Sequence, residues 1–250
     1  MNQSPEYIHS ELPAIQLFQK LDYQYLNGSQ ADERADNTEV LLKTRLKAAI
    51  QRLNPWISPA NAEKAYDKIT RVNGASLMDI NQQIWALLRG DTFTVKQVID
   101  GKEDFHAVRY IDYRAGQMAN NDFLVVNQMR YRNRIGRQSI PDLVVYVNGL
   151  PIAVLECKSP TAATAWDSAY NDLTEYQDLN PKLFYYNQLC VGLWGVGGRY
   201  GAINSPQKFY SVFRTLKGQP TAFLGKNPTA QAELIYALFQ KESLLSLIHI

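Results

Sequence analysis

Two apolar segments, 143–147 and 152–157, separated by Asn148-Gly149, constrain the fold of this chain more than any other feature of the sequence. Both segments contain several β-branched residues, which favour strands, and both are short enough to be strands. Asn-Gly tolerates the positive φ angles of a tight hairpin turn and is the strongest short hairpin signal in a sequence. The sequence therefore predicts a buried antiparallel strand pair.

Apolar periodicity on either side of this pair predicts further helices and strands. Helical spacing occurs at 6–25, 37–53, 58–72, 77–88, 161–177 and 229–250. Short β-branched and aromatic runs predict strands at 93–99, 107–113, 123–127 and 188–194, the last followed by a glycine-rich hairpin turn. We therefore expect an α/β fold in which a central mixed β-sheet is flanked by helices, with a mainly helical region at 1–92.

Composition excludes several kinds of site. Cys157, Cys190 and three scattered histidines give no spacing for a disulfide scaffold, structural zinc or haem. No apolar run approaches the roughly 18 residues of a membrane span, and the first residues lack a secretory signal, so a cytoplasmic location without a membrane partner is expected. The net charge of +2 neither requires nor excludes nucleic acid.

The residues best suited to catalysis are Asp142, after Pro141, and the Glu156-Cys157-Lys158 segment. Carboxylates are the oxygen ligands that Mg²⁺ prefers, and phosphodiester hydrolysis needs a cation to neutralise the charge that develops on phosphorus-bound oxygens. A neighbouring lysine can orient a water molecule or stabilise charge. The pattern therefore indicates a magnesium-dependent hydrolase site.

Strand geometry allows a test of this hypothesis. Glu156 and Lys158 are two positions apart and leave the same face of a strand, whereas Cys157 points into the core. A three-residue loop would place Asp142 opposite Glu156, but a two-residue loop would place Asp142 opposite Leu155, on the wrong face. The hypothesis thus requires an odd loop length or a bulge. The competing interpretation is two solvated strand-end acids and a surface lysine, although ionised side chains are costly on apolar strands.

The segment 137–158 resembles the nuclease core of type I restriction enzyme R subunits. In that family a Pro-Asp strand, an Asn-Gly-Leu-Pro turn and a Glu-x-Lys strand follow in this order, as they do here. The shared turn makes the match specific. Further resemblance at 11–14, 180–188 and 201–206 extends it over most of the chain.

The resemblance implies a restriction-endonuclease-like PD-(D/E)xK fold and Mg²⁺-dependent cleavage of double-stranded DNA. Asp142 and Glu156 would bind the metal together with the Cys157 backbone carbonyl, and Lys158 would help to activate the attacking water. Glu11 would be the family's upstream acid, on an early helix that reaches the metal site.

It also implies a domain organisation and partners. Residues 1–235 would form the endonuclease domain, with 93–235 as its sheet-containing core. Residues 236–250 would begin a connection to an ATP-dependent translocase domain. ATP would bind only to that translocase. The partners would be DNA, those motor domains, and the specificity and methyltransferase subunits of the complex.

One position departs from the family pattern. The family often has Gln-x-x-x-Tyr on the helix after the lysine strand; here Tyr176 fits, but Asp172 occupies the glutamine position. A carboxylate there would repel a phosphate rather than donate to it. Asp172 therefore supports an alternative in which the chain is a non-catalytic assembly module. A DNA-repair nuclease of the same fold is a second alternative.

Four arginines precede Asp142 and are candidates for DNA contact. Phosphate neutralisation by such side chains drives non-specific DNA binding, and Arg137 is the strongest candidate. The competing interpretation is a solvated, salt-bridged edge. The candidates are Arg130, Arg132, Arg134 and Arg137.

Overall fold

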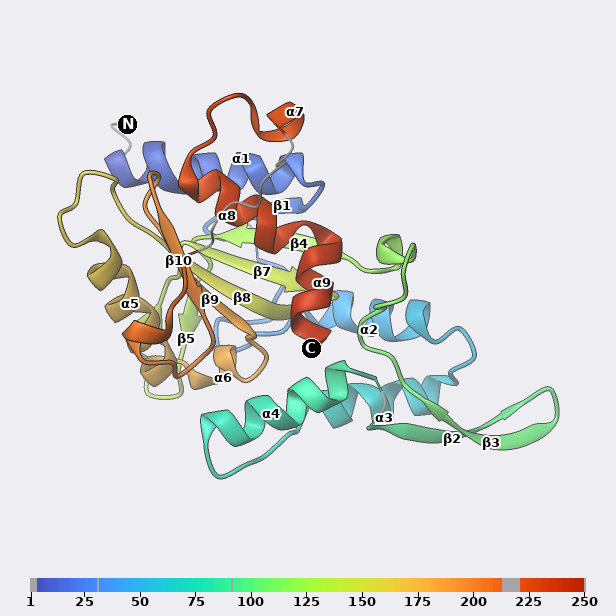
Figure 1. Ribbon diagram of the computed structural model, residues 1–250. Helices are drawn as coiled ribbons and strands as arrows, with labels where there is room; N and C mark the ends of the chain where they lie inside the picture. The colour runs from blue at the N-terminus through green and yellow to red at the C-terminus, as the bar shows by residue number, and fades with distance from the viewer. Residues whose placement is uncertain (1–3, 31, 91, 213–220, 250) are drawn as a thin grey trace.

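A six-stranded mixed sheet with the order β1-β4-β7-β8-β9-β10 forms the centre of the computed structural model, which describes residues 4–30, 32–90, 92–212 and 221–249 (Figure 1). Its strands are β1 (Gln24–Asn27), β4 (Phe123–Asn127), β7 (Leu143–Val147), β8 (Leu150–Cys157), β9 (Leu189–Leu193) and β10 (Gly198–Gly201). Strands β4, β7 and β8 are antiparallel, as are β9 and β10, whereas β1 pairs in parallel with β4, and β8 with β9. The predicted α/β architecture with a central mixed sheet is confirmed.

β7 and β8 form the predicted hairpin, which contains a bulge. Val147 pairs with Leu150, so the turn has two residues, and the alternative of a three-residue loop is wrong. Asn148 and Gly149 have φ values of 54° and 79°, the positive angles that a tight two-residue turn needs. Beyond the turn the register shifts by one, which leaves Ile152 as an extra residue on β8.

The bulge decides which side chains share a face. After the shift Leu143 pairs with Leu155. Continued by one residue, this register places Asp142 opposite Glu156. The requirement for an odd loop or a bulge is thus met by the bulge.

Helices cover both faces of the sheet. α5 (Ala165–Leu179) covers one face, where a Cβ on Gly192 of β9 would lie 2.9 Å from the ring of Trp166. Leu193 points to the other face and pairs with Gly198, which lies against Leu234 of α8 (Ala230–Phe239). α1 (Leu12–Lys20) packs beside α8 (Figure 1). The two flanking layers place α5 next to the end of β8.

The remaining N-terminal elements form a helical group with a projecting hairpin. The helices are α2 (Lys43–Leu53), α3 (Pro59–Thr70) and α4 (Leu77–Leu88), and the hairpin consists of β2 (Thr94–Ile99) and β3 (Lys102–Ala107) (Figure 1). Ser58 and Ser76 cap α3 and α4 by accepting a hydrogen bond from the backbone N–H three residues on. Their starts agree with the sequence prediction.

Three predicted helices differ from the structure in their bounds. The helix expected over 6–25 ends at Lys20, because Asp22 adopts φ 63°, and β1 follows as an edge strand. The helix expected from residue 37 begins at Lys43. The helix expected over 229–250 is broken at Gln240, whose ψ is 133°, into α8 and α9 (Lys241–His249).

The strand expected at 107–113 is absent from the described structure, and β3 ends at Ala107 instead. Two buried asparagine side chains take the place of a partner strand. Asn54 bonds both the backbone N–H and the carbonyl of Arg109, and Asn121 does the same for Asp112. The buried backbone groups are satisfied without a ladder.

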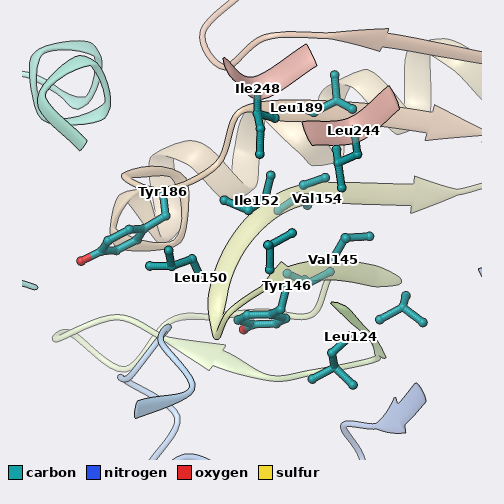
Figure 2. Packing of buried hydrophobic residues seen from close by; sticks show 14 of the residues in the cluster. Leu124, Val145, Tyr146, Leu150, Ile152, Val154, Tyr186, Leu189, Leu244 and Ile248 are labelled. Atoms are coloured by element: carbon teal, nitrogen blue, oxygen red, sulfur yellow. The ribbon is translucent and has the colours of Figure 1, made fainter. Parts of the chain in front are cut away.

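Short elements complete the described chain: η1 (Tyr7–Glu11), η2 (Met118–Asn120), β5 (Tyr131–Arg132), β6 (Gln138–Ser139), α6 (Pro181–Phe184), η3 (Gln207–Phe209) and α7 (Thr221–Leu224). Leu244 and Ile248 of α9 belong to the same buried cluster as Val154 and Leu189 of the sheet (Figure 2). The expected division between residues 235 and 236 lies within α8. The assignment of residues 1–235 to the endonuclease domain and of 236–250 to a connection stays a prediction.

Candidate active site

Asp142 and Glu156 lie on one face of the sheet at the end of the β7-β8 pair. Asp142 immediately precedes β7, and Glu156 is the next-to-last residue of β8. They are only 6% and 4% exposed, respectively. Ionised carboxylates this deeply buried are costly unless other groups compensate them, so their contacts determine what the site can do.

Hydrogen bonds fix both oxygens of Asp142. Its Oδ2 accepts from the backbone N–H of Cys157 at 2.7 Å, and its Oδ1 accepts from the Gln128 side-chain amide at 2.8 Å. Burial raises the pKa of Asp142; the bond from Cys157 lowers this pKa in part, and the charge of Glu11 raises it further. Asp142 is therefore held rigidly in a site that disfavours its charge.

Glu11 of η1 reaches the same region, linked to Asp142 through Gln128. Its Oε1 accepts from the side-chain amides of Asn127 and Gln128, both at 3.2 Å. Burial raises the pKa of Glu11, and these two hydrogen bonds lower it in part. Across residues 4–30, 32–90, 92–212 and 221–249, no group of three or more His, Cys, Asp and Glu side chains is arranged to hold a metal ion. Glu11 is thus near the acid pair without completing such a group.

Glu156 has one satisfied and one unsatisfied oxygen. Its Oε1 accepts from Lys158 Nζ at 2.7 Å. Its Oε2 is buried and has no hydrogen-bond partner among the described residues. Burial raises the pKa of Glu156 well above its ordinary value, the charge of Asp142 raises it further, and Lys158 opposes both. An unpaired buried carboxylate oxygen beside a second carboxylate suits a cation.

Lys158 joins the end of β8 to α5. Its ammonium group lies 2.7 Å from Glu156 Oε1 and 2.6 Å from Asp172 Oδ2. Burial alone lowers the pKa of Lys158, but the charges of Glu156 and Asp172 outweigh burial and raise it. Lys158 is therefore held in its charged form, and Asp172 is not a free negative charge.

Tyr176 lies one turn after Asp172 on α5, so both side chains face the end of β8. The Tyr176 hydroxyl donates a long hydrogen bond, 3.4 Å, to the backbone carbonyl of Ile140, two residues before Asp142. Burial raises the pKa of Tyr176, and the charge of Glu156 raises it further. The hydroxyl is thus held neutral beside the acids.

Cys157 is fully buried, and burial followed by the charge of Asp142 raises the pKa of its thiol. Its thiol is not suited to bind a metal as a thiolate. The expected contribution of its backbone carbonyl to a metal site stays a prediction.

Comparison with known proteins identifies the family. The family described as type I restriction enzyme R protein N terminus matches residues 3–209. The chain belongs to this family.

Two relatives cover nearly the whole chain of this R-protein N terminus. The protein named as the type I restriction enzyme MjaIXP endonuclease subunit of Methanocaldococcus jannaschii is 30% identical over 95% of the chain. The type I restriction enzyme HindI endonuclease subunit of Haemophilus influenzae is 29% identical over 94% of the chain. The chain spans 24% and 23% of the lengths of these relatives.

The four candidate arginines of this R-protein N terminus lie in and around β5 and β6. All four are exposed, and none forms an ion pair within the described part of the chain. Arg132 and Arg134 line a cleft of about 1080 Å³, together with Arg71 and Lys182. Asp142 and Glu156 are not among the residues that line it. The candidates in this group are Arg130, Arg132, Arg134 and Arg137.

Sequence reasoning missed two features of this site. The first is Gln128, whose side-chain amide donates to both Asp142 and Glu11 and which adopts φ 53° directly after β4. Its signal was available, because Asn127-Gln128 is a polar pair that ends an apolar strand. The ion pair of Asp172 with Lys158 could not be seen in the sequence, where Asp172 looked only like a repulsive substitution.

No helix among the described residues combines the length and apolar character that a membrane crossing requires.

Proposed function

We propose that this chain is the nuclease part of a type I restriction enzyme and cleaves double-stranded DNA with Mg²⁺. The observation that carries the proposal is the strand register, which ends at the Leu143–Leu155 pair and, continued by one residue, places Asp142 opposite Glu156. One oxygen of Glu156 is buried and has no hydrogen-bond partner among the described residues. Family membership supports it, since relatives are named endonuclease subunits. We further propose that the chain has the PD-(D/E)xK fold.

The residues present suit a magnesium ion. Asp142, Glu156 and the Cys157 carbonyl would hold it through oxygen atoms, and Mg²⁺ usually keeps several waters, so few protein ligands are needed. The ion would stabilise the charge that develops on the phosphate and lower the pKa of a bound water. Its positive charge would also offset the repulsion between the two acids, whose burial raises the pKa of each.

The other side chains have roles that follow from their contacts. The Cys157 N–H and the Gln128 amide hold Asp142 in one orientation. The Lys158 ammonium group, kept charged by its two acidic partners, would stabilise negative charge and orient the attacking water. The neutral Tyr176 hydroxyl can donate to a phosphate oxygen.

DNA would be held by the exposed arginines on the β5-β6 side. The cleft lined by Arg132 and Arg134 also contains Arg71 and Lys182, which form ion pairs with Asp67 and Glu39. Arg132 and Arg134, which form no ion pair among the described residues, would supply the positive charge that attracts a phosphate backbone. We propose that sequence recognition, methylation and ATP-driven translocation belong to other domains and subunits of the complex, since the chain spans only about a quarter of its relatives. A cytoplasmic location is part of the same proposal.

The alternative of a non-catalytic assembly module loses its main support. It depended on a free carboxylate at Asp172, but Asp172 is paired with Lys158. The alternative of a repair nuclease is less favoured, because the matching family is that of type I R proteins.

The decisive experiment replaces Asp142 with Asn in the full-length subunit within its complex. We expect cleavage of a plasmid that carries the recognition site to fall by about 100-fold or more, because charge stabilisation at the reacting phosphate is lost. ATP hydrolysis should continue. Asp104→Asn, on the exposed β3 strand, is the matched control. Cleavage by the Asp142→Asn complex at the wild-type rate would overturn the proposal.

A further inference from the structure

The Lys158 ammonium group is shared between two carboxylates from different elements. Glu156 belongs to β8 and Asp172 to α5, and the two N–O distances differ by only 0.1 Å, at 2.7 and 2.6 Å. The side chain of Lys158 is 14% exposed and that of Asp172 is 33% exposed. Lys158 therefore has an ion pair with Asp172 that does not depend on Glu156.

Sharing matters because Glu156 has a second role in the proposed function. If Glu156 binds a dication, the ammonium group on its Oε1 faces a like charge at close range, which is unfavourable in a buried site. Lys158 must then shift its contact away from Glu156 or weaken the binding of the metal. A second carboxylate determines where the ammonium group goes.

We propose that Asp172 is a positioning residue that takes over the Lys158 ammonium group when Glu156 binds the metal ion. The inference rests on the proposed function, because it takes Asp142 and Glu156 as the metal-binding pair. This role gives a physical reason for Asp172 at the position where the family often has glutamine, because a carboxylate holds an ammonium group more strongly than an amide oxygen does.

The surroundings of Asp172 support this role. α5 is anchored by Ala165, Ala169 and Leu173, which are buried against the sheet, so Asp172 has a fixed place relative to β8. Glu175, one turn on, is exposed and has no ion-pair partner among the described residues. Asp172 alone of these two acids reaches the lysine, and Glu175 provides a matched control for the loss of one negative charge from α5.

The test measures binding of Mg²⁺ alone to the chain by isothermal titration calorimetry. We expect Asp172→Asn to raise the dissociation constant about three- to fivefold, the upper end of the range for a partly exposed ion pair, and Asp172→Glu to restore affinity. Glu175→Gln should leave affinity within about twofold, as expected for a solvated charge. Thermal unfolding of each variant checks that the fold is retained.

A double-variant cycle separates a role through lysine from a general charge effect. If Asp172 acts through Lys158, then Asp172→Asn has no more effect than Glu175→Gln once Lys158→Met is present. An equal loss of affinity in both backgrounds would overturn the inference. In cleavage by the full complex, Asp172→Asn should raise the Mg²⁺ concentration that gives the half-maximal rate, whereas Glu175→Gln should leave it unchanged.

Asp142→Asn distinguishes the two proposals. If Asp142→Asn abolishes Mg²⁺ binding while Asp172→Asn behaves like Glu175→Gln, the metal site stands and the role of Asp172 is refuted. If Asp142→Asn leaves Mg²⁺ binding unchanged, the proposed site is refuted, and the inference with it.

Discussion

Removal of the Gln128 side chain should destabilise the fold in a pH-dependent way. Gln128 donates to Asp142 at 2.8 Å and to Glu11 at 3.2 Å, and both acceptors are buried carboxyl groups. A hydrogen bond to a charged group contributes about 1.5–3 kcal/mol, and the longer bond contributes less, so Gln128→Ala should lower the unfolding free energy by about 2–3 kcal/mol at pH 8. The backbone bond from the Gln128 N–H to the Asp142 carbonyl is retained.

The pH dependence follows from the direction of the pKa shift of Glu11. Burial raises this pKa in the folded state, and the bond from Gln128 lowers it in part. A group with a raised folded pKa loses its contribution to stability as pH rises through that pKa. Gln128→Ala raises the pKa of Glu11 further, so its cost should be larger at pH 8 than at pH 4, where the carboxyl group is largely protonated in both states.

Urea unfolding at the two pH values measures this difference. Gln19→Ala, at an exposed position of α1, is the control for the loss of a glutamine side chain. An equal cost of Gln128→Ala at pH 4 and pH 8, or a cost no larger than that of Gln19→Ala, would refute the assignment of Gln128 as the bridge between the acids.

Two further predictions concern the hairpin turn and the basic cleft. Gly149→Ala should cost at least about 2 kcal/mol in urea unfolding, because the position has positive φ and the new Cβ would lie 2.6 Å from the Leu42 carbonyl oxygen. Gly116→Ala, also at positive φ but with open space, should cost only about 1 kcal/mol; equal costs would contradict the close approach of α2. Arg132→Ala with Arg134→Ala should reduce the slope of log affinity for DNA against log salt by about 2, and an unchanged slope would remove the cleft from the DNA path.

The parts of the site that lie close in sequence could be predicted. Asn148-Gly149 indicated a hairpin. Alternation along 152–157 predicted that the side chains of Glu156 and Cys157 point to opposite faces of the sheet. The loop length was left open, although the sequence contains a hint. Pro151 has no N–H for a strand ladder and is tolerated at a bulge, which is where it lies.

The parts that depend on distant contacts could not be predicted. β1 is a strand because it pairs with β4, about a hundred residues later, whereas the helical spacing of the apolar residues before it predicts a helix that extends into this segment. The segment around Tyr110 has the composition of a strand, but Asn54 and Asn121 bind its backbone instead. Likewise, Asp172 meets Lys158 only because α5 returns across the sheet. Local propensity is overridden wherever a tertiary partner satisfies the backbone or the charge.

The single extra residue in β8 makes the tight turn compatible with the spacing of the two acids. Loss of Ile152 alone would remove the bulge and leave a regular two-residue hairpin, in which Asp142 still lies opposite Glu156. Loss of the bulge without loss of a residue would instead place Leu155 opposite Asp142 and turn Glu156 to the other face. Homologous hairpins can therefore differ in turn length and still align their acids, provided that a bulge absorbs any residue that would otherwise shift the register.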